Sequence, residues 1–404
     1  MCNHFRMAEN DQFSMTFYNF VVLTRVGISV KVHIREYICS DILAEWKKFY
    51  RQHRYKDYMK MAIVTTTIHI PVVLEDFSII AQENSIKDLQ FVVAGDAKTP
   101  AECKTFCDGI EDKYGYETIY IGLEDQYSEY SKLANYIPKN SISRRNFAIL
   151  KAYEMGADII IMVDDDNFPV LRENYFRGHS IVGSAQYLNH IESKSMWFNV
   201  CNTLLEKHGA KFFHRGFPVN FRYEAETKIV RKKAKIALNE GLWMDAPDTD
   251  AVTWLNWPDL QVISYLGGLY GETFAIADNT WSPLNSQNTA IMREAIPSYF
   301  LNPFNLRYDD IWAGYIFEKV AKHLGYSISF GLPLVEQRRN PHDYLVDLRN
   351  EIDGMTRTPS LIKELFQIDL ESKSFYDSTE ELINHLSPKF QDIKEGYQLW
   401  LQHF

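Results

Sequence analysis

Five consecutive apolar residues, 159–163, run directly into three aspartates, Asp164, Asp165 and Asp166. An apolar run without polar alternation is typical of a strand that is buried on both faces, as in a parallel sheet covered by helices. The three carboxylates therefore follow the carboxyl end of a strand, which is where open α/β sheets bind their ligands. This feature restricts the chain to folds in which a buried sheet presents acidic side chains at one edge.

The segment that precedes these aspartates alternates between strand-like and helix-like stretches. Strand-like runs cover 61–67, 89–94, 117–121 and 157–163, and helical patterns cover 71–83, 99–114 and 141–155. Such alternation indicates a mainly parallel sheet flanked by helices. We therefore expect an α/β, Rossmann-like fold, to which the helical patterns near the end of the chain add C-terminal helices.

The pattern divides the chain into three parts. We expect an N-terminal extension over 1–58, a catalytic domain over 59–353 and a C-terminal helical segment over 354–404. The extension is either a real appendage or sequence translated upstream of a start at Met59 or Met61. We favour the second interpretation because the compact pattern begins only there. Over 195–350 the sequence predicts shorter strands and longer loops.

Composition excludes several classes of protein. The formal net charge of −10 argues against a nucleic-acid-binding protein, which would carry a basic patch. Five scattered cysteines favour free thiols in a reducing compartment. No apolar run reaches the roughly 20 residues that a membrane span needs. We expect a cytoplasmic protein, and the composition leaves homo- or hetero-oligomerisation open.

The acidic triplet is the strongest candidate for a metal site. Successive strand residues point in alternating directions, so Asp164 and Asp166 can share one face. This arrangement suits Mn²⁺ or Mg²⁺ bound to a diphosphate, since both ions take oxygen ligands. The alternative is a solvated acidic turn, which we consider less consistent with a preceding buried strand.

Other polar residues in this half are candidates for binding a nucleotide. Thr65 and Asp96 lie at strand ends, and Asp96 is suited to accept hydrogen bonds from a uracil or a ribose. Taken alone, Asp96 is better explained as a turn residue that bonds its own backbone. Arg144 and Arg145 open a helix, where the helix dipole disfavours them, so a bound phosphate is one explanation. Two solvent-facing charges are the other.

Two further acidic segments point to a sugar. Asp309 and Asp310 precede an amphipathic helix, where they are either caps or residues that orient a sugar hydroxyl or act as a base. The loop 239–251 contains Trp243, Asp248 and Asp250. We consider these three to be sugar or nucleotide contacts, and the alternative is an ordinary packed loop.

Five motifs in one order resemble the reversibly glycosylated polypeptide family, whose best-known members are UDP-arabinopyranose mutases of plants. They are Val-Asp-Asp-Asp (163–166), Arg-Gly-Phe-Pro (215–218), Gly-Leu-Trp-x-x-x-Pro-Asp-x-Asp-Ala (241–251), Arg-Tyr-Asp-Asp-Ile-Trp-Ala-Gly (307–314) and His-Leu-Gly-Tyr…Gly-Leu-Pro (323–333). The resemblance covers about 62–353. It implies a glycosyltransferase-A-like fold, a UDP-sugar substrate, and Mn²⁺ or Mg²⁺.

The resemblance also implies roles for single residues. Asp164 and Asp165 would hold the nucleotide next to the metal, Arg215 would be the self-glycosylation position, and Arg222 would match a second required arginine. The chain departs from the pattern at Thr249, where the family has Tyr. It also lacks the family's His after Gly-Leu-Pro. The nearest histidine is His342, which we assign as the third metal ligand beside Asp164 and Asp166.

Three functions follow from these residues. The first is a UDP-sugar mutase that interconverts pyranose and furanose forms and glycosylates itself. The second is a metal-dependent glycosyltransferase for an external acceptor, with Asp309 or Asp310 as the base. The third is a non-catalytic scaffold that binds UDP-sugars.

Overall fold

The computed structural model describes residues 59–170, 175–223, 225–340 and 342–404. The predicted N-terminal extension, residues 1–58, lies outside the described part of the chain, and so does the question of where translation begins.

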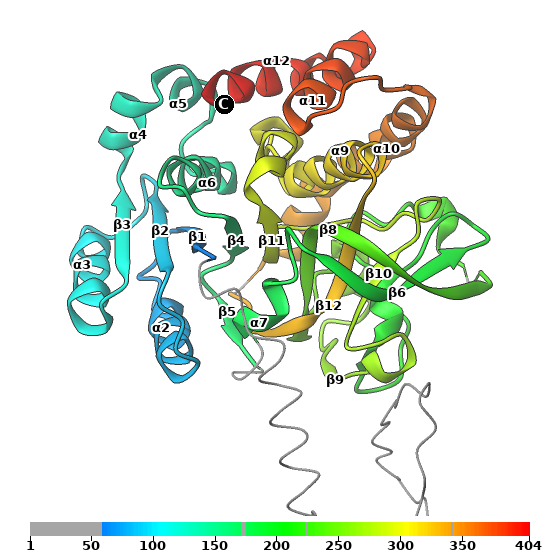
Figure 1. The fold of residues 1–404 in the computed structure, drawn as a ribbon, viewed down its shortest axis with the longest axis horizontal. Helices are drawn as coiled ribbons and strands as arrows, with labels where there is room; N and C mark the ends of the chain where they lie inside the picture. Colours follow the sequence, from blue (N-terminus) through cyan, green and yellow to red (C-terminus); the bar gives the residue numbers. More distant parts are fainter. Residues whose placement is uncertain (1–58, 171–174, 224, 341) are drawn as a thin grey trace, which may run out of the picture. The chain divides into compact units, whose positions relative to one another are not determined.

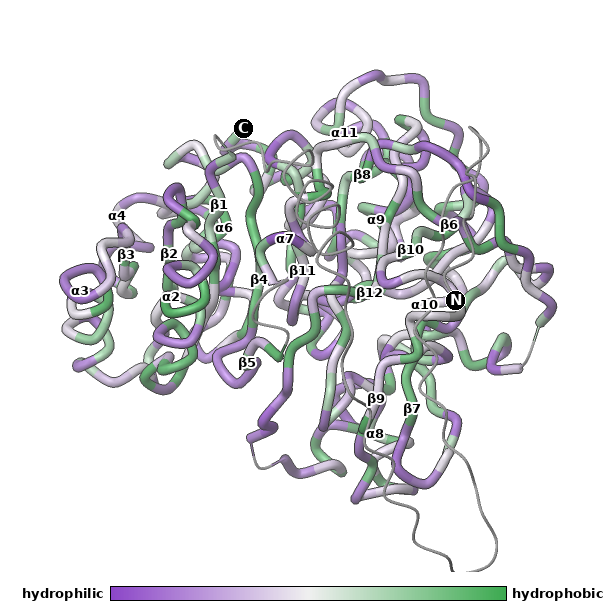
Figure 2. The backbone as a smooth tube through the Cα atoms, turned by 60° about the horizontal axis from the view of Figure 1, so that its bottom comes forward, coloured by the Kyte–Doolittle hydropathy of each residue, from purple (hydrophilic) through white to green (hydrophobic). Residues whose placement is uncertain are grey.

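The first half of the described chain alternates strands and helices as the sequence pattern predicts. Its elements are β1 (Met61–Thr67), α2 (Val73–Glu83), β2 (Leu89–Gly95), α3 (Glu102–Tyr114), β3 (Glu117–Ile121), α4 (Leu123–Glu129), α5 (Ser131–Tyr136), α6 (Arg145–Glu154), β4 (Ile159–Val163), β5 (Asn167–Pro169) and α7 (Tyr175–His179). The strands β1, β2 and β4 are buried throughout, which explains their largely apolar sequences. Figure 2 shows hydrophobic residues along β1 and β4.

The second half contains more strands than the sequence suggests, and two of them are long. Its elements are β6 (Ala185–Ser193), β7 (Leu204–Glu206), β8 (Thr227–Asp245), α8 (Ala251–Asn256), β9 (Val262–Tyr265), β10 (Thr273–Ile276), β11 (Asn288–Met292), α9 (Asp309–His323), β12 (Tyr326–Gln337), α10 (Tyr344–Gln367), α11 (Phe375–His385) and α12 (Gln391–Trp400). The prediction of shorter strands agrees with β7, β9 and β10, which have 3, 4 and 4 residues. It is wrong for β8, which has 19 residues, and for β12, which has 12.

The strands join in one 12-stranded sheet whose order begins β3-β2-β1-β4. These four strands are all parallel, so the predicted parallel sheet is confirmed for this half. The helix α6 packs against β1 and β2. In Figure 1, α2 and α3 lie lower in the view than α6, and the C-terminal helices α11 and α12 lie at its top. The expected α/β class with flanking helices is thus confirmed.

The other half of the sheet is mixed. The strand β11 runs antiparallel to β4 and to β8, and β8 runs parallel to β12. Four strands close a ring, because β8 pairs with β6, β6 with β10, β10 with β12, and β12 again with β8. A closed ring leaves fewer free strand edges. The end of β12 also pairs with β5, the strand that begins immediately after the acidic triplet.

The C-terminal helices pack against the same unit as the sheet. The helix α10 runs without interruption through the expected boundary at 353/354, and the described residues belong to one compact unit. Within α10, the hydroxyl of Thr358 accepts a hydrogen bond of 2.8 Å from the indole of Trp312 in α9. No described helix is long and apolar enough to cross a membrane.

Candidate active site

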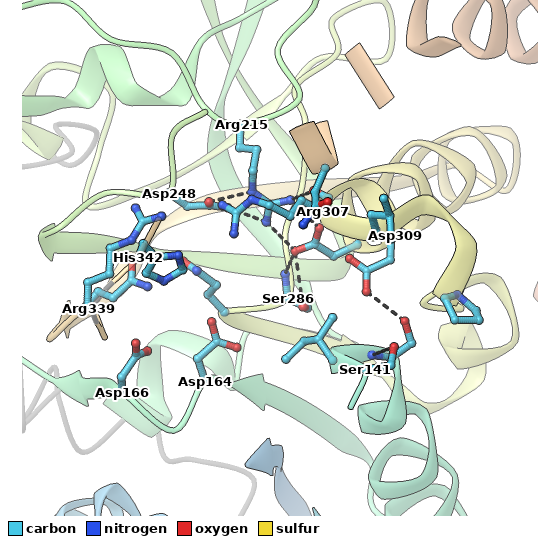
Figure 3. Close-up of a pocket in the computed structure, with 18 of the residues that line it drawn as sticks. Ser141, Asp164, Asp166, Arg215, Asp248, Ser286, Arg307, Asp309, Arg339 and His342 are labelled. Carbon is cyan, nitrogen blue, oxygen red and sulfur yellow. Dashed lines mark hydrogen bonds and ion pairs between the residues drawn. The ribbon is translucent and has the colours of Figure 1, made fainter. Parts of the chain in front are cut away.

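Two pockets meet at the acidic end of β4. The smaller one, about 290 Å³, is lined by residues at the carboxyl ends of β1, β2 and β4, at the start of α6 and just after β12: Thr66, Thr67, Ile68, His69, Asp96, Lys98, Asn140, Ser141, Ile142, Arg145, Asp164, Asp165, Asp166 and Asn340. The larger one, about 370 Å³, shares Asp164 and Asp166 with it and extends to Arg215, Asp248, Ser286, Arg307, Asp309, Asp310, Arg339 and His342. Figure 3 shows these side chains converging from both halves of the sheet. The parallel topology therefore brings the predicted acidic residues to a shared cavity.

Each aspartate of the triplet has a different environment. The carboxylate of Asp164 accepts a hydrogen bond from Arg145, and that of Asp165 accepts one from the hydroxyl of Thr67. Burial raises the pKa of Asp165. Burial, together with repulsion from Asp164 and Asp165, raises the pKa of Asp166 to about 7. A positive charge bound beside Asp166 would relieve this repulsion.

Several buried oxygen atoms around the triplet have no hydrogen-bond partner within the described residues. They are Oδ1 of Asp166, Oδ1 of Asn167, Oε1 of Gln287 and Oε1 of Gln337. Asn167 in β5 is the register partner of Gln337 in β12, so these two residues are neighbours. Carboxylate and amide oxygens are the ligands that Mg²⁺ and Mn²⁺ accept. The residues present therefore fit a hard divalent cation.

His342 lines the larger pocket with Asp164 and Asp166, but one of its ring nitrogens is paired outside the triplet. Its Nδ1 lies 2.9 Å from Oδ2 of Asp347 in α10. In the part of the chain that the structure describes, no three His, Cys, Asp or Glu side chains form a metal-binding group. The amide oxygen of Gln337, which the sequence analysis did not consider, is a further candidate ligand, because it is buried without a partner and Gln337 pairs with Asn167, the residue after Asp166.

The arginine pair that opens α6 is buried, and the Nη groups of both residues donate hydrogen bonds within the protein. Arg144 donates 2.6 Å and 2.9 Å hydrogen bonds to Gln126 Oε1 and the carbonyl of Ile137, and it lines neither pocket. Arg145 donates to the carbonyl of Ser286 at 2.6 Å and to Asp164. Arg145 therefore orients the acidic triplet, while Arg144 is held away from any phosphate in the pockets.

The two candidates at the ends of β1 and β2 also differ. Asp96 lines the smaller pocket, but its carboxylate accepts from the backbone of Ser141 and of Ala97 at 2.9 Å and 2.6 Å. It thus serves first as a turn residue that fixes the loop before α6. Thr65 is buried in β1 and lines neither pocket. Its neighbours Thr66 and Thr67 take the pocket position expected for it.

Arg215 lies in the wall of the larger pocket between two carboxylates. It contacts Asp248 through Nε and Nη2 at 2.8 Å and 3.0 Å, and Asp310 through Nη1 and Nη2 at 2.9 Å each. Nη1 also donates to the carbonyl of Arg307, so all five N–H groups of the guanidinium are used. The pKa of Arg215 is well above its usual value: burial opposes this rise, but Asp248 and Asp310 outweigh it.

The aspartates around Arg215 differ in the direction in which their pKa values are shifted. Burial alone would raise the pKa of Asp248, but Arg215 outweighs it and lowers that pKa to about 2. Asp309 has no such partner and accepts a 3.1 Å hydrogen bond from the hydroxyl of Ser143. Burial, and then the neighbouring Asp310, raise the pKa of Asp309 to about 7. Asp309 is thus suited to exchange a proton near neutral pH.

A family model described as "Reversibly glycosylated polypeptide" matches residues 128–399, which include the acidic triplet, Arg215 and Asp309. The chain belongs to this family. Similar proteins include "Probable UDP-arabinopyranose mutase 4" of Arabidopsis thaliana, 25% identical over 261 residues, or 60% of this chain and 66% of that protein. "Probable UDP-arabinopyranose mutase 1" of Pisum sativum is 26% identical over 262 residues, with 60% and 66% covered. The alignments thus span about two thirds of the length of these relatives.

Two solved glycosyltransferases are also similar to this member of the reversibly glycosylated polypeptide family. One is glucosyl-3-phosphoglycerate synthase from Mycobacterium tuberculosis with Mn²⁺ and UDP-glucose, with a TM-score of 0.36 and 11% identity over 82% of this chain and 85% of that one. The other is the mannosyltransferase PcManGT from Pyrobaculum calidifontis with GDP-mannose and Mn²⁺, with a TM-score of 0.31 and 8% identity over 89% and 93%.

Three residues of the reversibly glycosylated polypeptide motifs lie outside both pockets. Trp243 is fully buried, and its ring packs edge-on against His214. Asp250 caps α8, where it accepts from the backbone of Thr253 at 2.8 Å. Arg222 bonds Asp250 rather than reaching the cavity. These three side chains contact other parts of the protein, and none of them lines either pocket.

Sequence reasoning missed three basic or polar residues that line the larger pocket of this family member. They are Arg307, Arg339 and Gln337. Arg307 is the first residue of the motif 307–314, in which only Asp309 and Asp310 were assigned a role. Arg339 and Gln337 follow Gly-Leu-Pro, at the place where the expected histidine is missing. That departure from the family pattern was the available signal.

Proposed function

We propose that this protein is a UDP-sugar-utilising enzyme of the mutase type, similar to a UDP-arabinopyranose mutase. The observation that carries the proposal is the meeting of two pockets at the acidic end of β4, with Asp309 in the larger one. The relatives named UDP-arabinopyranose mutases support the choice of chemistry. We further propose a cytoplasmic location.

The two pockets suggest a division of labour. The smaller pocket, lined by Thr66, Asp96 and Lys98, would take the nucleoside, and the larger one would take the sugar. A bound Mn²⁺ or Mg²⁺, held by Asp164 and Asp166 with the amide of Gln337, would supply positive charge to the diphosphate as the bond to the sugar breaks. Arg145 would keep Asp164 oriented during that step.

Self-glycosylation at Arg215 meets a physical obstacle in this arrangement. A nitrogen that attacks an anomeric carbon needs a free lone pair, but the guanidinium is protonated and donates all its hydrogens to Asp248, Asp310 and Arg307. Attachment would require at least one of these contacts to open and a proton to leave. In the arrangement described, Arg215 instead positions the two acids of the sugar pocket.

The decisive experiment is incubation with UDP-arabinopyranose and Mn²⁺ without an acceptor, followed by separation of pyranose from furanose nucleotides. We expect UDP-arabinofuranose to accumulate. Asp166→Ala should abolish both the reaction and Mn²⁺-dependent binding of the UDP-sugar in calorimetry. Retained Mn²⁺-dependent affinity in this variant would contradict the site assignment. Peptide mapping by mass spectrometry would show whether sugar is attached to Arg215.

The second candidate function is transfer of the sugar to an external acceptor. It is favoured by Asp309, a buried carboxylate in the larger pocket with a pKa of about 7, which is suited to remove a proton from an acceptor hydroxyl. Release of UDP only when an acceptor is added would favour this function. Binding of the UDP-sugar without any turnover would favour the third function, a non-catalytic scaffold.

A further inference from the structure

Arg339 is the second residue after β12, and it lines the larger pocket. Its guanidinium lies 4.6 Å from the ring centre of Trp254 and 5.7 Å from that of Tyr344. The side chain is only 11% exposed. Figure 3 shows Arg339 next to His342, on the wall above Asp164 and Asp166. The aromatic rings therefore fix a positive charge near the acidic triplet.

This guanidinium donates no hydrogen bond to any residue that the structure describes. Its nearest carboxylate oxygen, on Asp347, is 3.6 Å away, beyond hydrogen-bonding distance, and its Nε is buried without a partner. Asp347 is also shared with Arg307 at 3.5 Å and with His342 at 2.9 Å. The Nε of this largely buried cation is thus left without an acceptor, which is costly unless a ligand satisfies it.

The other arginines of the site differ in this respect. Arg144, Arg145 and Arg215 all donate to protein acceptors, and Arg307 donates to Glu351 at 2.8 Å. Among the described arginines that line the two pockets, Arg339 is therefore the one that donates no hydrogen bond to the protein, so its whole fork is available to a ligand. A ligand that matches a planar fork of N–H groups is an anion with paired oxygens, above all a phosphate.

We propose that Arg339 binds a phosphate of the nucleotide's diphosphate, on the side of that group opposite the acidic triplet. The inference rests on the proposed function, which places a nucleoside diphosphate where the two pockets meet. It assigns to Arg339 the phosphate contact that the sequence suggested for Arg144 and Arg145. With the triplet and its cation on one side and Arg339 on the other, the diphosphate would be neutralised from two directions.

The neighbouring Arg338 offers a matched control. Its side chain is 56% exposed, pairs with Glu336 at 3.0 Å and lies over Phe168, and it lines neither pocket. Replacing either arginine by methionine removes the same charge from adjacent positions of the chain. A difference between Arg338→Met and Arg339→Met therefore reports the position of the guanidinium rather than the net charge.

The test is isothermal calorimetry with UDP and, separately, with uridine, on the full chain in the presence of Mn²⁺. We expect Arg339→Met to weaken UDP binding by about 10- to 100-fold, as for loss of a charged hydrogen bond, and to leave uridine binding unchanged. Arg339→Lys should weaken UDP binding less, because it keeps the charge but loses the fork. Arg338→Met should bind both ligands as the parent does.

Unchanged UDP affinity in Arg339→Met would overturn the inference and leave the proposed function standing. An equal loss for UDP and uridine would also overturn it, because it would mean that Arg339 only supports the fold. If the parent protein binds neither ligand, the proposed function itself fails. Should thermal unfolding show that Arg339→Met is not folded, Arg339→Lys decides by the same comparison of UDP with uridine.

Discussion

At the scale of single residues, neighbours decide what each acid of the pocket can do. Asp248 and Asp310 are both bonded to Arg215, whereas Asp309 receives only a hydroxyl hydrogen bond from Ser143 among its side-chain partners. A carboxylate that is buried without a cation holds its proton to higher pH. Asp309 is consequently the acid of this cluster suited to proton transfer at neutral pH.

Asp309→Asn should lower kcat by about 100- to 10,000-fold, the range for loss of a general acid or base. If Asp309 acts as a base, the parent's kcat/KM rises with pH through about 7, where the carboxyl loses its proton, and the variant lacks this limb. Ser143→Ala keeps the carboxylate but removes a bond that lowers its pKa, so the limb should move to higher pH. A pH–rate profile that is identical in all three proteins would rule out this role.

At the scale of elements, α9 shows how a helix can be buried on nearly all sides. Only Lys319, Lys322 and His323 escape full burial along it. Glu318 and Lys322 pair at 2.9 Å inside the protein. Burial raises the pKa of Glu318 to about 7, although Lys322 opposes the rise. A buried acid of this kind destabilises the fold when it is ionised, unless its partner is present.

Lys322→Met should therefore destabilise the protein by about 3–5 kcal/mol at pH 8, as measured by urea denaturation. The loss should shrink at pH 5, because the folded-state pKa of Glu318 lies above its unfolded value and the proton is then retained. The double replacement Glu318→Gln with Lys322→Met should recover much of the stability. A loss that does not change between pH 5 and pH 8 would contradict the assignment.

The elements also show what the sequence could predict. The strand β4 is a continuous apolar run, and β1 and β2 are largely apolar, so local pattern was sufficient for them. The strand β8 was missed, because its first half carries exposed lysines and an arginine over 228–235 and pairs with β6 far from the core. Its edge pattern resembles a polar loop until the pairing partner is known.

The site was predictable to a similar degree. The triplet at the end of β4 depends on a neighbouring strand, so its place followed from the pattern. The guanidinium of Arg144 is held away from the pockets by hydrogen bonds to Gln126 and Ile137, which lie outside its own helix. Nothing local in the sequence predicts those contacts. The position of Arg339 in the pocket could not be predicted, because it depends on the pairing of β12 with β5.

At the scale of the whole molecule, the C-terminal helices complete the core on which the site is built. Trp400 at the end of α12 is fully buried, and its indole donates to the carbonyl of Pro297 at 3.2 Å. Its ring lies 5.5 Å from that of Phe300. The backbone of the next residue, Leu301, is bonded to Asn146 in α6, so the last helix is connected to the helix that carries Arg145.

Trp400→Ala should cost about 3–5 kcal/mol of unfolding free energy, as expected for a large side chain removed from a core. Chemical denaturation monitored by circular dichroism would measure it. The exposed Gln398 on the same helix provides the comparison, since Gln398→Ala should change stability by less than about 0.5 kcal/mol. Equal effects of the two substitutions would mean that α12 is dispensable for the fold.

The way Arg215 is held has a consequence for covalent labelling. Dicarbonyl reagents attack guanidinium groups that are accessible and have lost a proton. Arg338, at 56% exposure, meets the first condition, whereas Arg215 is 6% exposed and is held in its protonated form by two carboxylates. A labelling time course should therefore modify Arg338 early and Arg215 only as the chain unfolds. Arg215 would then serve as a built-in reporter of global opening.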